Sequence, residues 1–388
     1  MRPNLIAYLR QYGNKSFEEL PFSEVDSLIL TEMSYFKFDG LVPGFRHGMA
    51  VRRPVTLKEL QTHPDMEKMF SDEVFGKRYR ELFELVCAGR RFGRTRVNYF
   101  VNYVDKAKEM QFSAVTFFME NRVRYIAYRG TDETLIGWKE NFNMAYMESI
   151  PAQRAALSYF RKVAGMSRGP LMIGGHSKGG NLAVYVAACC ESAYQKRILT
   201  VYSFDGPGFS REFYVDSGYR RIQDKICKIV PAYSVVGMIL DNEMGFRPVD
   251  SFGTGLLQHD PFTWVIKNGR FQYRHDIYRR VSHKTKVLNL WIDSLSTRQI
   301  QDFVDISYGV LTASQARTVY ELSKGPMRRL FLILKALRGL DQGARKILAL
   351  VLGRLLHFKW KSAEETLKSS VSAVSDNRKQ KRRQSRSR

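Results

Sequence analysis

The segment Leu171–Ala183, LMIGGHSKGGNLA, places one His-Ser-Lys tripeptide among four glycines. An apolar run, Leu171–Ile173, precedes the glycines and predicts a short β-strand. Apolar residues then recur at helical spacing, at Leu182, Ala183, Val186, Ala187 and Cys190. The segment therefore predicts a strand that turns into a helix within one or two residues.

Gly175–Gly179 fits the pattern G-x-S-x-G, the nucleophile elbow. A turn this tight forces its central residue into a strained backbone conformation, and glycines on each side let strand and helix pass closely. Ser177 would then protrude above a helix N-terminus, whose amides favour an oxyanion. A phosphate loop needs Lys before Ser or Thr, and here the order is Ser177-Lys178. A purely structural glycine turn is the remaining alternative.

Strand and helix patterns alternate along the middle of the chain, which predicts an α/β fold with a mostly parallel sheet flanked by helices. Residues 87–112 are basic, and we interpret them as irregular. The predicted strands cover 111–120, 122–130, 171–174, 197–206 and 225–231, and the predicted helices cover 151–164 and 179–193.

A serine nucleophile needs a histidine base and an acid that follow it in chain order. The histidines that follow Ser177 before the C-terminal region are His259, His275 and His283. We favour His259, because it lies in a loop-like stretch after the last predicted strand. Asp205, directly after the strand TVYSF, and Asp241 both remain candidates for the acid, with a slight preference for Asp205.

The oxyanion donors should come from the elbow and from a loop after an earlier strand. The elbow supplies the backbone amide of Lys178. The strand that ends at Tyr128 is followed by Arg-Gly-Thr-Asp, in which Thr131 offers both an amide and a hydroxyl.

These motifs resemble those of the class 3 lipases in order and approximate spacing. More closely, residues 4–300 resemble the bacterial Mbeg-like family, a lipase-related domain of unknown function. The blocks that carry this resemblance include YRGTDETLIGWKENFNMAY, VPAYSVVGMIL and GLLQHDPFTW. The resemblance implies an α/β-hydrolase fold, with Ser177 as nucleophile, His259 as base, and Thr131 and Lys178 as oxyanion donors.

Two positions depart from the lipase pattern. Ser234 occupies the place of the acid, so the acid stays open. Lys178 stands beside the nucleophile where lipases usually carry an apolar residue; an ammonium there would favour anionic substrates or point to solvent.

We therefore expect a serine hydrolase of carboxylic esters, lipids among them, that needs neither metal nor organic cofactor. The alternative is an inactive α/β-hydrolase scaffold that binds an anionic membrane or nucleic acid. The four cysteines form no disulfide or metal pattern, and the N-terminal residues lack a signal-peptide core. These features favour a cytoplasmic protein, with peripheral membrane association as a further expectation.

The C-terminal part of the chain is strongly basic. Residues 301–388 contain 19 lysines and arginines against 7 aspartates and glutamates, and so carry half of the net charge of +24. We predict a hydrolase domain over 1–305, amphipathic basic helices over 306–370, and a disordered basic tail over 371–388. The helices could lie on an anionic membrane or pack on the core with a solvated basic face. Contact of the tail with nucleic acid is the less favoured expectation.

Overall fold

The computed structural model describes residues 2–45, 53–72, 74–132, 135–240, 245–274, 287–314, 326–354 and 356–358. Among the residues predicted above, Asp241, His275 and His283 lie outside the described part of the chain, as does the tail 371–388.

The centre of the fold is an eight-stranded sheet whose strands follow one another in chain order. Strands β1 to β4 pair antiparallel, and β4 to β8 pair parallel. The strands are β1 (Val55–Thr56), β2 (Arg96–Asp105), β3 (Met110–Phe118), β4 (Arg124–Tyr128), β5 (Leu171–His176), β6 (Ile198–Phe204), β7 (Ile226–Pro231) and β8 (Arg247–Val249). A separate hairpin is formed by β9 (Ile266–Lys267) and β10 (Arg270–Phe271).

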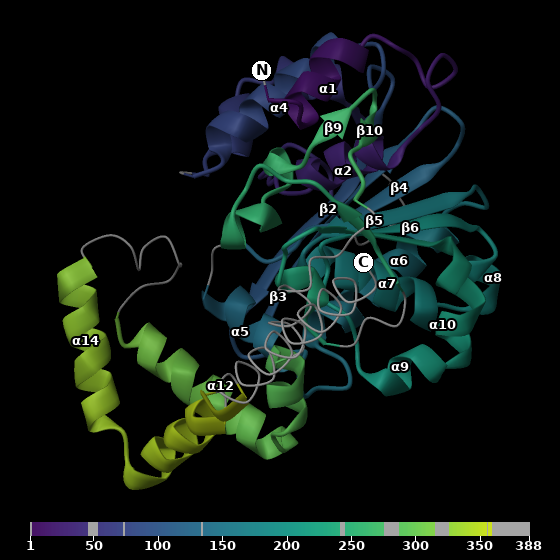
Figure 1. Ribbon diagram of the computed structural model, residues 1–388. Coiled ribbons are helices and arrows are strands. Elements are labelled where there is room, and N and C mark those ends of the chain that lie inside the picture. Colours follow the sequence, from purple (N-terminus) through teal and green to yellow (C-terminus); the bar gives the residue numbers. More distant parts are fainter. Residues whose placement is uncertain are drawn as a thin grey trace, which may run out of the picture.

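Helices cover both faces of this sheet (Figure 1). The α-helices include α1 (Leu5–Tyr12), α2 (Glu24–Met33), α3 (Leu57–Gln61), α4 (Gly76–Ala88), α5 (Leu135–Asn143), α6 (Pro151–Gly165), α7 (Lys178–Cys189), α8 (Ser192–Gln195), α9 (Arg211–Val215), α10 (Ser217–Ile222), α12 (Thr297–Thr312) and α14 (Pro326–Gly339). Alternate residues of β4 separate the two cores, as strand geometry requires. Tyr125 and Ala127 pack with α1, α2 and α4, whereas Ile126 and Tyr128 pack with α6, α7 and α10.

This arrangement confirms the predicted α/β-hydrolase fold. The predicted strands and helices from residue 111 to residue 231 are present, with boundaries that shift by a few residues. One interpretation was wrong: residues 87–112 are not irregular, because Arg96–Asp105 form β2, the antiparallel partner of β3, and β3 itself begins at Met110. Its pairing shifts between Asn98 and Val101, and Tyr99 has a φ of 57°. A bulge of this kind breaks the alternation by which a strand is recognised.

The C-terminal helices stand apart from the sheet (Figure 1). Buried Leu295, Ile300, Val304 and Val351 form a small separate core there. On α14, by contrast, apolar side chains remain 37–65% exposed: Leu330, Phe331, Leu334 and Leu337. Within the described residues, no helix is both long and apolar enough to cross a bilayer. The domain boundaries at residues 306 and 371 stay predictions.

Candidate active site

The bend between β5 and α7 has the geometry expected of a nucleophile elbow. Ser177 adopts φ 58° and ψ −130°, a backbone conformation with positive φ that residues other than glycine rarely adopt. The flanking glycines make this bend fit. A Cβ on Gly175 would lie 2.1 Å from the carbonyl carbon of Gly179, and a Cβ on Gly179 would lie 2.1 Å from the carbonyl oxygen of Tyr128. Larger residues at either position would force strand and helix apart.

His259 and Asp205 are brought together from positions 54 residues apart. His259 ends the short 3-10 helix η4 (Gly255–His259), and Asp205 directly follows β6. The Nδ1 atom of His259 lies 2.6 Å from Oδ2 of Asp205, whose side chain is fully buried. The rings of His259 and His176 are 4.5 Å apart, so the imidazole of His259 lies beside the elbow.

Two further groups hold the Asp205 carboxylate. Ser234, at the position where the lipase pattern has its acid, donates its hydroxyl to Oδ2 at 2.6 Å. The amide of Gly237 donates to Oδ1 at 3.0 Å. The segment after β7, where the lipase pattern places its acid, thus contributes Ser234, which orients the Asp205 carboxylate at the end of β6.

The loop after β4 lies against the elbow. A Cβ on Gly130 would come within 3.1 Å of the Ser177 Cβ, so the Gly130 backbone passes next to the serine, and Thr131 follows it directly in the chain. Thr131 donates its hydroxyl to Oδ1 of Asn141, at 2.8 Å, on α5. This leaves the Thr131 amide, and not its hydroxyl, as the donor to consider. Lys178 is the first residue of α7, where backbone amides have no intrahelical acceptor.

The sequence suggested that the Lys178 ammonium would favour an anionic substrate or point to solvent. The structure shows neither orientation. The ammonium is fully buried and lies 2.7 Å from Oε2 of Glu140. It also donates to the backbone and side-chain oxygens of Gln111, at 2.6 and 2.8 Å. The partner Glu140 comes from α5, 38 residues earlier, which the residues near Ser177 give no means of predicting.

The sequence reasoning also missed His176 and Tyr35. The Nε2 atom of His176 lies 2.9 Å from the backbone carbonyl oxygen of His259. The Tyr35 hydroxyl lies 3.3 Å from His176 Nδ1 and accepts a hydrogen bond from the Gly130 amide at 3.1 Å. Position 176 beside the nucleophile was the one available signal. Tyr35 belongs to an N-terminal segment with no motif of its own.

Buried acid and base groups around the elbow have shifted protonation equilibria. Burial, together with the neighbouring His259, holds the pKa of His176 well below its usual value. Burial raises the pKa of Glu32, whose Oε1 lies 3.8 Å from His176 Nδ1. Burial also lowers the pKa of Lys228 to about 7, and the negative charge of Asp205 opposes this shift.

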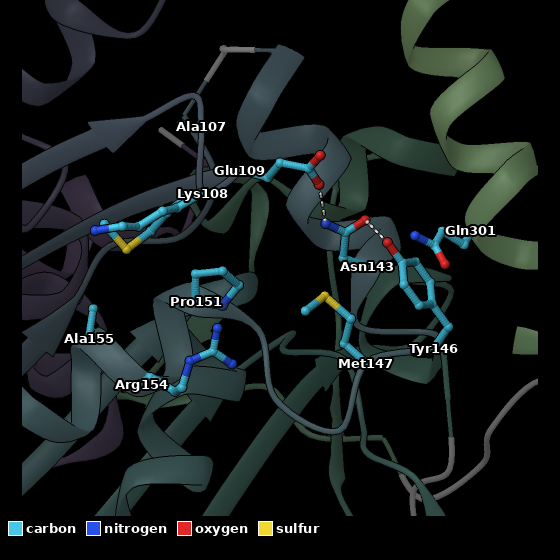
Figure 2. A pocket seen from close by; sticks show the side chains of 11 residues that line it. Ala107, Lys108, Glu109, Asn143, Tyr146, Met147, Pro151, Arg154, Ala155 and Gln301 are labelled. Atoms are coloured by element: carbon cyan, nitrogen blue, oxygen red, sulfur yellow. Dashed lines mark hydrogen bonds between the residues drawn. The ribbon is translucent and has the colours of Figure 1, made fainter. Parts of the chain in front are cut away.

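A pocket of about 530 Å³ lies on another part of the molecule, between the β2–β3 turn, the start of α6 and α12 (Figure 2). None of the candidate site residues lines it. Among its lining side chains, Asn143 donates a hydrogen bond to Glu109 and accepts one from the Tyr146 hydroxyl (Figure 2). Among the described residues, no cluster of three His, Cys, Asp or Glu side chains could hold a metal ion.

Comparison with known proteins gives one family and several solved structures. The model of the Mbeg1-like family matches residues 86–309. The structure is similar to M37 lipase, at 14% identity over 56% of this chain and 70% of that chain, with a TM-score of 0.36. It is also similar to lipase from Rhizopus microsporus var. chinensis, at 13% identity over 62% of this chain and 91% of that chain, with a TM-score of 0.32. Lip2 lipase from Yarrowia lipolytica is similar at 11% identity over 41% of this chain and 67% of that chain, with a TM-score of 0.30. A search of curated proteins returned no match.

Proposed function

The chain belongs to the Mbeg1-like family, and we propose that this member is a serine hydrolase that cleaves carboxylic esters, lipid esters among them. The observation that carries the proposal is the 2.6 Å contact between His259 Nδ1 and the buried Asp205 carboxylate, beside a strained serine at an elbow. Burying a carboxylate is costly, and a binding scaffold has no need of one against a histidine. The enzyme proposal is therefore preferred to the inactive scaffold.

The proposed reaction begins with attack of Ser177 Oγ on the acyl carbonyl carbon. Because Nδ1–H of His259 donates to Asp205, Nε2 is the nitrogen that can take the serine proton. His259 then returns this proton to the leaving alcohol, and the acyl-enzyme forms. Water attacks the acyl-enzyme with His259 again as base, which releases the acid and restores Ser177.

The oxyanion that develops in both steps is assigned to the amides of Thr131 and Lys178. Each such donor lowers the barrier by about 3 kcal/mol in serine hydrolases. The adjacency of Gly130 to Ser177 and the place of Lys178 at the N-terminus of α7 support this assignment.

Labelling with a fluorophosphonate probe tests the proposal, because the probe traps only an activated serine. We expect stoichiometric labelling of the wild type, and none of Ser177→Ala or His259→Ala. Replacement of the exposed Ser192 by alanine is the matched control and should label like the wild type. Failure of the wild type to label, or labelling of Ser177→Ala, would refute the proposed activity.

We further propose that α14 brings this hydrolase to an anionic membrane surface. Its exposed Leu330, Phe331 and Leu334 are accompanied by exposed Lys335 and Arg338. A short helix with apolar side chains and positive charges suits the boundary between anionic headgroups and acyl chains. This supports lipid esters as the substrate class.

A further inference from the structure

The buried ion pair between Lys178 and Glu140 connects the two segments to which the oxyanion donors are assigned. Lys178 itself carries one donor, its backbone amide. Glu140 lies on α5 next to Asn141, whose Oδ1 accepts a hydrogen bond from the hydroxyl of Thr131, the residue of the second donor. We propose that this ion pair is a positioning device that fixes the two oxyanion donors relative to each other, an inference that rests on the proposed function.

Every hydrogen-bonding group of the pair is engaged. The three ammonium protons of Lys178 meet Glu140 Oε2 and two oxygens of Gln111, within 2.8 Å. Glu140 Oε2 also accepts from the Gln111 amide at 3.1 Å, and Oε1 accepts from the Ala152 amide at 2.9 Å. The carboxylate thus joins α5 to strand β3 and to the first turn of α6, and the ammonium ties the elbow to the same point.

A buried ion pair needs this degree of hydrogen bonding to offset the hydration that both charges lose. A buried ion pair recovers little net free energy over apolar side chains of the same volume, because both charges lose their hydration. What it adds is direction, since the acceptors of an ammonium must lie at defined positions. An apolar residue at position 178 would pack against α5 without fixing its register.

The Thr131 hydroxyl links the loop that carries the second oxyanion donor to α5. Its bond to Asn141 makes the 130–132 loop follow any movement of α5. If α5 shifts relative to the elbow, the distance between the Thr131 and Lys178 amides changes, although neither residue is altered. An oxyanion bound by both would then lose part of its stabilisation, while substrate binding would be unaffected.

Two substitutions that keep the shape of the pair test the inference in the full-length chain: Lys178→Met and Glu140→Gln. The matched control is Lys139→Met, on the same helix, where the ammonium of Lys139 pairs instead with Glu109 and Asp305. Circular dichroism and thermal melting first establish that each variant folds. The double variant guards against misfolding from one unpaired buried charge, because it removes both charges together.

Hydrogen exchange of peptides that span residues 126–132 gives a readout that needs no activity. We expect exchange at least tenfold faster in the double variant and unchanged in Lys139→Met. Ester hydrolysis gives the second readout, with kcat lowered roughly 10- to 100-fold and KM within twofold. Each single variant should lose about as much as the double, because the two residues act as one unit.

The outcomes separate this inference from the proposed function. Unchanged exchange in the 126–132 peptides overturns the positioning role, whether or not the wild type hydrolyses an ester. Faster exchange with wild-type kcat, or equal losses in Lys139→Met, overturns it as well. If the wild type is inactive and unlabelled, the proposed function fails, and exchange alone decides whether the pair fixes the loop.

Discussion

His176 Nε2 lies 2.9 Å from the carbonyl oxygen of His259, so the neighbour of the proposed nucleophile holds the backbone of the proposed base. The carbonyl can only accept, so Nε2 carries the proton and Nδ1 is free to accept from the Tyr35 hydroxyl. That hydroxyl in turn accepts from the Gly130 amide. A chain of hydrogen bonds therefore runs from the loop beside Ser177 to the proposed base.

His176→Phe should lower kcat about tenfold without changing KM, because the His259 backbone loses its donor and the ring can drift from the serine. His176→Gln keeps an N–H donor at a similar distance and should recover most of the loss. Steady-state kinetics on a soluble ester measures both. Equal activity of the Phe variant and the wild type would show that this bond does not position His259.

The same histidine should make stability depend on pH. Because the folded state holds the pKa of His176 well below its usual value, only the unfolded chain binds a proton there near pH 6. Stability is then complete above about pH 6.5, the ordinary histidine pKa, and is lost as pH falls below it. The wild type should lose more in Tm between pH 8 and pH 5 than His176→Gln, which cannot titrate. Parallel losses in both proteins would contradict this origin of the pH dependence.

Asp205→Asn should reduce kcat by about 10³- to 10⁴-fold, because an amide in that place no longer favours the His259 tautomer with a free Nε2. The fold should survive, since the Asn side chain keeps an oxygen that can accept from the Ser234 hydroxyl or the Gly237 amide. Ser234→Ala removes one of those donors and should cost about tenfold. If the kcat of Asp205→Asn stays within threefold of the wild-type value, Asp205 is not the acid, and Asp241 becomes the preferred candidate.

The elbow was predictable because its evidence is local. Gly175, Ser177 and Gly179 lie within five residues, and the flanking strand and helix patterns are strong. The residues alone favour Asp205 over Asp241 only slightly, because the contact of Asp205 with His259 spans 54 residues and depends on two loops. The direction of the Lys178 side chain was not predictable, because its partner lies on another helix. Strand β2 was misread for a local reason, the bulge near Tyr99.

Lys228 offers a second titration at the proposed site. Its folded pKa of about 7 lies below the ordinary lysine value of about 10.4, so between these values the unfolded chain binds more protons. Wild-type stability from this group is lost as pH falls through about 7 and is complete above about 10. The Tm of Lys228→Met relative to the wild type should therefore be highest at pH 7 or below and decline toward pH 10. The exposed Lys196→Met controls for the loss of one positive charge; a Tm difference that does not vary with pH would rule out a buried titrating ammonium.

The membrane proposal predicts that the full chain floats with vesicles that contain phosphatidylserine and not with vesicles of phosphatidylcholine alone. Phe331→Ser/Leu334→Ser should lower the bound fraction at least tenfold, because these side chains are 65% and 44% exposed and would supply the buried apolar area. Leu199→Ser/Val215→Ser is the matched control, since these apolar residues are 48% and 61% exposed elsewhere on the protein. Added salt should weaken binding of the wild type, because the attraction of Lys335 and Arg338 to anionic headgroups is screened. Equal flotation of the two double variants would exclude α14 as the docking helix, and binding to both vesicle types would exclude selection by charge.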